Sequence, residues 1–182
     1  MKPNLILIGM PASGKSTLGR LLAAQLSLSF LDTDDVLMRH LGEALQETID
    51  RDGISRFLQR EEESVLTIQT QGCVIATGGS VVYSQRAMAH LKSRGLCIYL
   101  SVPFRLIEAR LNNLATRGVA IPQGQTLLDL FRQRDPLYAS YADLIFREDD
   151  RFGDRSCVAH TQMLAGMLAK RSELASIFQD VT

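Results

Sequence analysis

The sequence has no long apolar run, no excess of either charge and few cysteines. Its 182 residues include 20 lysines and arginines and 20 aspartates and glutamates, so the formal net charge is zero. This balance gives no electrostatic reason to expect a nucleic acid or an anionic membrane as a partner. The apolar runs are far shorter than the roughly 20 residues that a membrane-spanning helix needs. We therefore expect a cytoplasmic protein, without a membrane or nucleic-acid partner, that binds a small molecule.

Only three cysteines occur, at the widely spaced positions Cys73, Cys97 and Cys157. An odd number at such spacing argues against a disulfide framework and against a zinc site. Two of them lie inside apolar runs, so we expect buried free thiols. Internal repeats, low-complexity tracts and linkers are also missing, and the length suits one domain. We expect a single domain over residues 1–182 that acts as a monomer.

Short apolar runs alternate with helical patterns along the chain. Runs of this kind are typical of strands that are buried on both faces of a parallel sheet. The alternation predicts an α/β fold built from parallel β-α units, with a sheet of five strands. The runs are Leu5–Ile8, Phe30–Leu31, Cys73–Ala76, Cys97–Leu100 and Leu144–Phe146. The tail from Ser156 has the pattern of a final amphipathic helix.

A glycine-rich segment, GMPASGKST, follows the first apolar run and precedes a helical pattern. It fits the phosphate-binding loop G-x-x-x-x-G-K-[ST]. In such a loop the backbone N–H groups converge on phosphate oxygens, the lysine reaches the outer phosphates, and the hydroxyl can bind Mg²⁺. A chance glycine-rich turn is the alternative. The predicted nucleotide-binding residues here are Gly9, Ala12, Ser13, Gly14, Lys15, Ser16 and Thr17.

Two carboxylates follow the second apolar run, in the segment FLDTDD. Asp32 and Asp34 are two positions apart, so on an extended chain they would project to the same side. Phosphoryl transfer from ATP needs a carboxylate that binds Mg²⁺ or its water and a group that orients the attacking hydroxyl. We expect the pair to fill these roles. The alternative is that one of them only caps a helix that begins near Asp35.

Two further segments have features of a ligand site. The run from Cys73 ends in Gly78, Gly79 and Ser80, where glycines would let the backbone approach a ligand closely, although a plain strand-to-helix turn is the alternative. The segment Asn112–Gln125 has mixed polarity and no clear period. A loop of this length in a small domain is usually functional, so we expect a lid.

Together these motifs resemble the shikimate kinase family, within the nucleoside-monophosphate-kinase-like P-loop fold. That fold is a three-layer sandwich with a central five-stranded parallel sheet. The resemblance extends over nearly the whole chain. The segments that match the family are the phosphate-binding loop, D-T-D at Asp32–Asp34, F-x-x-x-E at Phe57–Glu61, A-T-G-G at Ala76–Gly79, the lid arginine Arg117, and R-D-P-L-Y at Arg134–Tyr138.

The resemblance implies roles on the nucleotide side. Ser16 and Asp32 would organise Mg²⁺, with Asp32 acting through water. Lys15 and Arg117 would stabilise charge on the transferred phosphoryl group, and Arg110 would lie along the adenine. Two alternatives stay open: Arg110 could be a surface residue of an amphipathic helix, and Arg117 a solvated lid side chain.

The resemblance also implies roles on the acceptor side. Asp34 would hold the acceptor hydroxyl as base or orienter, and Gly78 and Gly79 would line the acceptor pocket. Arg134 would bind an anionic group of the acceptor. Its alternative is a charge at a helix end that complements the helix dipole.

The chain departs from the family pattern at three places. The family pattern F-R-x-x-E reads FLQRE here, so Leu58 occupies the position of an arginine that contacts the acceptor carboxylate. Arg56 and Arg60 are roughly 200° away around a helix and cannot replace it. The third glycine of the family's G-G-G is Ser80, and the proline beside the lid arginine is Gly118. We expect an apolar pocket wall at Leu58, an added hydroxyl in the pocket at Ser80, and weaker carboxylate recognition.

The sequence therefore predicts a kinase that uses ATP and Mg²⁺ to phosphorylate a hydroxyl of a small metabolite. Shikimate, converted to shikimate 3-phosphate in aromatic amino acid biosynthesis, is the first candidate. Another hydroxylated metabolite, such as a sugar acid or a hydroxy amino acid, is the alternative. A nucleotide-binding regulatory module without catalysis is a second one. A nucleoside monophosphate kinase is disfavoured, because the acceptor side lacks the arginines that a phosphate acceptor requires.

Overall fold

The computed structural model describes residues 2–112, 121, 124–148 and 157–178. Within these residues, five parallel strands form one sheet in the order β2-β3-β1-β4-β5. The strands are β1 (Asn4–Ile8), β2 (Ser29–Asp32), β3 (Cys73–Ala76), β4 (Gly95–Ser101) and β5 (Leu144–Arg147). Every predicted run lies in a strand, and the predicted parallel sheet is confirmed.

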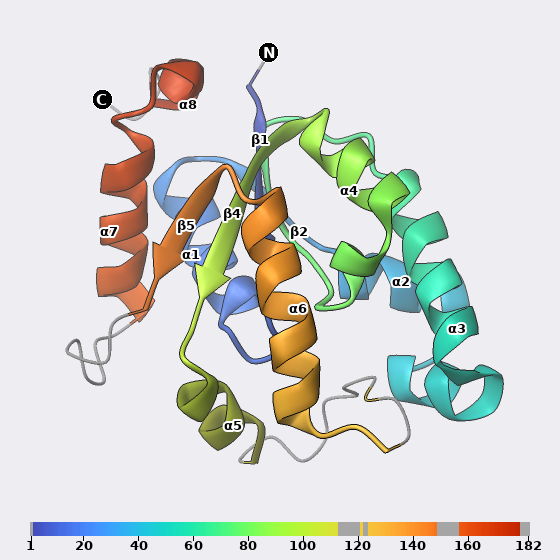
Figure 1. Ribbon diagram of the computed structural model, residues 1–182. Coiled ribbons are helices and arrows are strands. Elements are labelled where there is room, and N and C mark those ends of the chain that lie inside the picture. The colour runs from blue at the N-terminus through green and yellow to red at the C-terminus, as the bar shows by residue number, and fades with distance from the viewer. Residues whose placement is uncertain (1, 113–120, 122–123, 149–156, 179–182) are drawn as a thin grey trace.

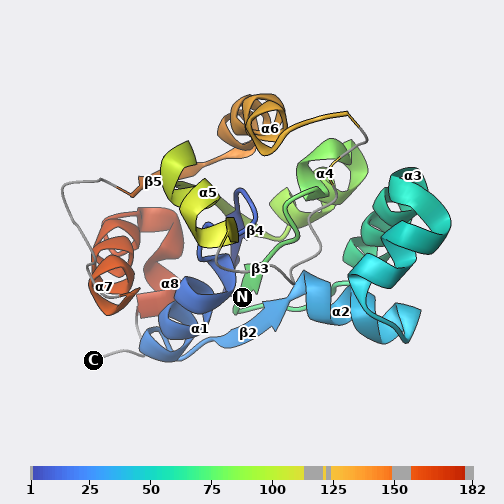
Figure 2. The ribbon, with the colours of Figure 1, turned by 90° about the horizontal axis from the view of Figure 1, so that it is seen from below.

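Helices cover both faces of this sheet and form the outer layers of a three-layer sandwich. Helices α1 and α7 lie on one face, and α4 and α6 lie on the other (Figures 1 and 2). The described α-helices are α1 (Lys15–Gln25), α2 (Thr33–Leu41), α3 (Leu45–Leu66), α4 (Gln85–Lys92), α5 (Phe104–Asn112), α6 (Leu127–Tyr141), α7 (Cys157–Leu168) and α8 (Ala175–Phe178). Short 3₁₀ helices occur at Val81–Tyr83 (η1) and Ser172–Leu174 (η3).

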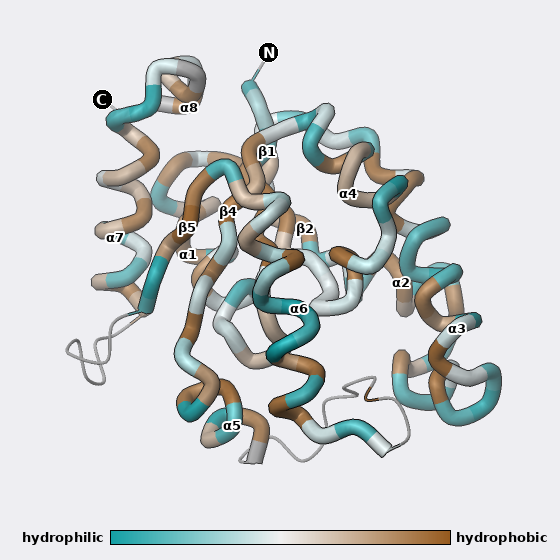
Figure 3. The backbone as a smooth tube through the Cα atoms, viewed as in Figure 1, coloured by the Kyte–Doolittle hydropathy of each residue, from teal (hydrophilic) through white to brown (hydrophobic). Residues whose placement is uncertain are grey.

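The two hydrophobic cores follow from the alternation of side chains along the strands. Leu5 and Leu7 of β1 pack with α1 and α7, whereas Ile6 and Ile8 pack with α4 and α6. All four side chains are fully buried. Hydrophobic residues run along the strands, while the turns of α3 carry many hydrophilic ones (Figure 3). A strand buried on both faces needs apolar residues at every position, which explains the continuous runs in the sequence.

Three details differ from the sequence predictions. Cys157 is exposed, so the expectation of a buried thiol is correct only for Cys73 and Cys97. Burial raises the pKa of Cys97 to about 12. The tail is not one helix, because α7 ends at Leu168 and is followed by η3 and α8. Ser156 itself lies outside the described residues.

The carboxyl ends of β1, β2 and β3 meet at the lower edge of the sheet in Figure 1. Ligands of open α/β sheets bind at this edge.

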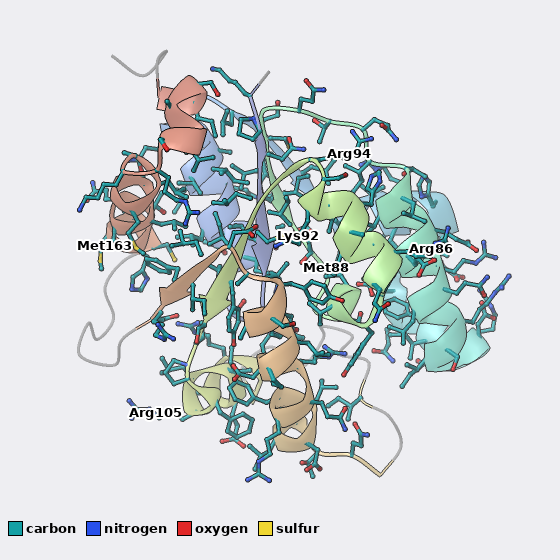
Figure 4. All side chains as sticks on the ribbon, turned by 45° about the horizontal axis from the view of Figure 1, so that its top comes forward. Arg86, Met88, Lys92, Arg94, Arg105 and Met163 are labelled. Atoms are coloured by element: carbon teal, nitrogen blue, oxygen red, sulfur yellow. The ribbon has the colours of Figure 1, made fainter. Side chains whose placement is uncertain are left out.

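Helices α3 and α4 are linked by Glu62 of α3. Its carboxylate accepts hydrogen bonds from Arg86 Nη1 at 2.7 Å and from Ser84 Oγ at 2.6 Å. Figure 4 shows Arg86 extending from α4 toward α3. In the part of the chain that the structure describes, no helix combines the length and the apolar character needed to cross a membrane.

Candidate active site

A cavity of about 430 Å³ opens at this edge of the sheet. It collects side chains from the ends of three strands and from the helices that follow them. Most of the residues predicted for the site line it: Ala12, Gly14, Lys15, Ser16, Thr17, Asp32, Asp34, Gly78, Gly79, Ser80 and Arg134. The cavity is thus a common space for the predicted nucleotide side and the predicted acceptor side.

The phosphate-binding loop is built around the start of α1. Gly14 is the N-cap of this helix with φ of 90°, a left-handed conformation that glycine adopts without strain. Lys15 is 8% exposed, and its ammonium donates to the carbonyl oxygens of Gly9 at 2.9 Å and Met10 at 2.8 Å. Gly9 and Ser13 support the loop and are not among the residues that line the cavity. The N-terminus of α1, with its partial positive charge, therefore faces the cavity beside a buried lysine.

The two predicted carboxylates do not lie together on an extended chain. Strand β2 ends at Asp32, whose Oδ1 accepts a hydrogen bond from the backbone N–H of Asp34 at 3.1 Å. This N-cap starts α2 at Thr33, so Asp34 lies in the first turn of the helix and the expected extended geometry is wrong. Both residues still line the cavity. Asp32 is therefore a helix cap and a cavity carboxylate at once.

The residues at this end of the cavity suit a magnesium ion that also binds nucleotide phosphates. Asp32 and Ser16 present a carboxylate and a hydroxyl to the same cavity. Mg²⁺ prefers oxygen ligands and commonly takes one or two from the protein, completing its shell with water and phosphate. No group of three or more histidines, cysteines or acidic residues that could hold a metal occurs among the described residues. A Mg²⁺ site that is completed by water and phosphate oxygens does not require such a group of three protein ligands.

The far end of the cavity is built around Gly78. A Cβ added to Gly78 would lie 2.1 Å from Glu61 Oε1 and 2.8 Å from Asp34 Oδ1, so any larger residue would displace these carboxyl groups. Both carboxyl groups therefore border the same backbone position. Glu61 Oε2 accepts a hydrogen bond from Ser80 Oγ at 2.6 Å, and both residues are buried. Burial raises the pKa of Glu61 to about 7, and the negative charge of Asp34 adds to this effect.

Arg134 lies within α6 and not at its end, which removes the helix-end alternative. The side chain is 3% exposed and lines the cavity. Its Nε donates to Tyr83 Oη at 3.2 Å, and its guanidinium carbon lies 5.0 Å from the centre of the Tyr83 ring. Tyr138, one turn further along α6, donates from Oη to the carbonyl oxygen of Gly79 at 2.5 Å. These contacts hold the guanidinium against the glycine loop that follows β3.

The position of Leu58 corrects a prediction. Leu58 packs with an apolar cluster of α2 and α3 that includes Leu37 and Phe57, and it is not among the residues that line the cavity. Its neighbours Arg56 and Arg60 are exposed, as their helical spacing predicted. The apolar wall expected from Leu58 is supplied by Phe57, which is 5% exposed and does line the cavity.

Arg110 lies near the last turn of α5 and contacts the phosphate-binding loop. Its Nη1 donates to the carbonyl oxygen of Ala12 at 3.4 Å, and its Nη2 donates to Glu148 Oε1 at 2.5 Å. Its side chain is 37% exposed and does not line the cavity, so the alternative of a surface residue on an amphipathic helix stays open beside the adenine role. Arg117 and most of the predicted lid lie outside the described residues.

Three residues of the site were missed as functional candidates. Glu61 entered the prediction only as the last residue of F-x-x-x-E and without a role of its own, although that spacing is a usable signal. Tyr83 and Glu148, which hold Arg134 and Arg110, follow no motif in the sequence. Each contact joins segments far apart in the chain, so local pattern does not reveal it.

Comparisons with known proteins agree with this geometry. The family model described as Shikimate kinase matches residues 11–165. Shikimate kinase 1 of Sodalis glossinidius is 36% identical over 154 residues, which cover 82% of this chain and 89% of that protein. Shikimate kinase of Vibrio vulnificus is 37% identical over the same length and coverage.

A solved structure also resembles the chain. Shikimate kinase from Acinetobacter baumannii in complex with shikimate superimposes with a TM-score of 0.81 and 28% sequence identity, covering 92% of this chain and 93% of the other. The fold, the shared cavity and the extent of these matches lead to one conclusion: the chain belongs to the shikimate kinase family and is an ATP-dependent kinase with a hydroxyl acceptor.

Proposed function

We propose that the protein transfers the γ-phosphoryl group of ATP to a hydroxyl of shikimate. The observation that carries this proposal is the shared cavity, which is lined by Lys15 and Ser16 and also by Asp34 and Arg134. In-line phosphoryl transfer requires a donor and an acceptor held in one water-excluding space. Family membership supports shikimate as the acceptor, and the buried Arg134 gives its carboxylate a partner.

On the nucleotide side, the backbone of the phosphate-binding loop and the Lys15 ammonium hold the β- and γ-phosphates. Magnesium, held by Ser16 and through water by Asp32, would supply positive charge between the phosphates. Arg110, fixed by Glu148, lies beside the loop in a position suited to the adenine. Arg117 of the lid adds a further positive charge beside the transferred phosphoryl group and so stabilises the negative charge on it.

On the acceptor side, Asp34 orients the attacking hydroxyl and takes its proton. Its Oδ1 lies beside Gly78, where the backbone leaves room for a ligand. Arg134 donates its remaining guanidinium N–H groups to the acceptor carboxylate, since its described hydrogen bond uses only Nε. Leu58 takes no part in this contact, so the acceptor carboxylate has one cation where the family pattern provides two. Gly79 and Ser80 complete the pocket.

We further infer a single domain over residues 1–182, with 112–125 as a lid, that acts as a monomer in the cytoplasm. Two hydrophobic cores on opposite faces of one sheet support the single domain. The lid would close over bound ATP and exclude water from the transferred group.

A coupled assay of ADP release tests the proposed reaction. We expect saturable turnover with shikimate, and weaker or no turnover with gluconate, homoserine or related polyols. Lys15→Ala removes the cation nearest the phosphates and should abolish turnover. Saturable turnover on one of the other acceptors alone would assign the protein to that substrate. Tight ATP binding without any acceptor-dependent ADP release would favour a regulatory nucleotide-binding module.

A further inference from the structure

Tyr138 of α6 places a buried hydroxyl group behind the glycine loop, residues 77–80, and this group takes no part in the proposed chemistry. The residue is 0% exposed and is not among those that line the cavity. Its ring is stacked on the ring of Tyr99 of β4, with 5.2 Å between the ring centres and 27° between the planes. A buried hydroxyl group is costly unless it is hydrogen-bonded. The contacts of Tyr138 Oη therefore show what this residue adds to the site.

The hydroxyl group holds one peptide unit of the glycine loop. Tyr138 Oη donates to the carbonyl oxygen of Gly79 at 2.5 Å, across 59 positions of the chain. The peptide bond between Gly79 and Ser80 is planar and trans, so fixing its carbonyl oxygen also fixes the opposite direction of the Ser80 N–H. Gly79 and Ser80 both line the cavity. The orientation of this part of the cavity wall is therefore set from α6.

The start of the glycine loop is anchored to other elements. The N–H of Thr77 donates to the carbonyl oxygen of Leu7 at 3.1 Å, and the N–H of Gly78 donates to Thr33 Oγ1 at 2.9 Å. These bonds hold the loop to β1 and α2. Glycine has little intrinsic preference for one backbone conformation, so the Gly79 peptide unit depends on its own anchor, Tyr138, to keep one orientation.

Gly79 also packs against the phosphate-binding loop. A Cβ added to Gly79 would lie 2.8 Å from Cδ and 3.0 Å from Cγ of Pro11, and 3.2 Å from Nη1 of Arg134. The Pro11 ring is therefore in direct contact with the glycine loop. Met10 Sδ, in the same phosphate-binding loop, lies 4.0 Å from Tyr138 Oη. The Tyr138 hydroxyl thus lies where the loop for the nucleotide and the loop for the acceptor meet.

We propose that Tyr138 is a positioning residue: its hydroxyl group holds the Gly79 peptide unit against Pro11 and so aligns the acceptor hydroxyl with the γ-phosphate. This inference rests on the proposed function. Transfer is sensitive to such alignment, since a misplacement of about 1 Å can cost on the order of a hundredfold in rate. Loss of the hydroxyl should therefore lower kcat as well as raise the KM for shikimate. A tyrosine that only filled the core would change stability alone.

Tyr138→Phe tests the inference, because it keeps the ring and removes only the hydroxyl. We expect the KM for shikimate to rise about fivefold and kcat to fall about tenfold, while the KM for ATP stays within about twofold. Tyr99→Phe is the matched control, since it removes a hydroxyl from the same ring stack, where it donates to Asp135 Oδ1. The control should lower the Tm comparably and leave kcat and both KM values unchanged. Equal kinetic constants in the two variants would overturn the inference.

A double-mutant cycle with Pro11→Ala tests the contact from the nucleotide side. Pro11→Ala leaves Tyr138 in the core and removes the ring that packs on Gly79, so it should also lower kcat and raise the KM for shikimate. Both substitutions loosen the same contact, so their combined effect on kcat/KM for shikimate should be smaller than the product of the single effects.

A combined effect equal to that product, or wild-type shikimate kinetics in Pro11→Ala, would overturn the inference and leave the proposed function intact. Absence of shikimate-dependent turnover in the wild type would instead overturn the proposed function, and the inference with it.

Discussion

The acceptor pocket depends on a few buried polar side chains that are held by residues outside any motif. Arg134 is the clearest case, because a guanidinium that is 3% exposed needs partners in the folded chain. Tyr83 provides a hydrogen bond to Nε and an aromatic face at 5.0 Å. Both contacts fix the guanidinium plane before an acceptor arrives, which lowers the entropic cost of binding.

Tyr83→Phe should therefore raise the KM for shikimate about fivefold, because a net hydrogen bond is worth about 1 kcal/mol and the ring contact is retained. Tyr83→Leu loses both contacts and should raise it further. The KM for ATP should change in neither variant. Equal losses for ATP and shikimate would indicate general unfolding of the loop after β3 and would contradict a positioning role.

Helix α3 forms the wall of the acceptor pocket and also carries its main departure from the family. A left-handed Gly53, with φ of 79°, divides the helix, and the part that follows presents Phe57 and Glu61 to the cavity. Leu58 is three positions before Glu61, so the two side chains are neighbours on the helix surface. An arginine at this position would have to leave the apolar cluster of Leu37 and Phe57 to reach Glu61 and the acceptor carboxylate.

Leu58→Arg should lower the KM for shikimate by about ten- to a hundredfold, since a charge-assisted contact is worth about 1.5 to 3 kcal/mol. Gln59→Arg adds the same charge on the exposed face of α3 and serves as the control. An unchanged KM in Leu58→Arg would mean that Arg134 alone sets carboxylate recognition.

The elements were predictable where the signal was local. Continuous apolar runs identified the strands, and the spacing of glycine, lysine and serine identified the start of α1. A helix cap by one of the two aspartates was an open alternative in the sequence, and the hydrogen bond from Asp34 N–H to Asp32 Oδ1 assigns that cap to Asp32. The contacts of Glu61 with Ser80 and of Arg134 with Tyr83 span 19 and 51 positions in the chain. Such pairs depend on how the sheet and helices pack, which no local pattern specifies.

At the scale of the whole molecule, the cavity carries a carboxyl group, Glu61, that is buried at a cost in stability. Glu61 has a pKa of about 7 in the folded chain against 4.5 as its ordinary value. Between these two pH values the folded state binds more protons than the unfolded state, so the free energy of unfolding falls as the pH rises. The destabilisation is complete above about pH 7 and absent below about pH 4.5.

Glu61→Gln should therefore gain stability relative to the wild type as the pH rises. We expect the difference in the free energy of unfolding to be about 2 to 3 kcal/mol larger at pH 8 than at pH 5. Urea denaturation at both pH values measures it, with Glu63→Gln as the exposed control. A constant difference between the variant and the wild type would show that Glu61 ionises normally in the folded protein.

The central claim is that one cavity brings ATP and shikimate together for phosphoryl transfer. Phosphorus NMR of a mixture of the protein, MgATP and shikimate tests this most directly, because it identifies the product. We predict a phosphomonoester signal that grows with ADP, requires shikimate and is absent with Lys15→Ala. Inorganic phosphate released at the same rate with and without shikimate, with no phosphomonoester, would contradict the account.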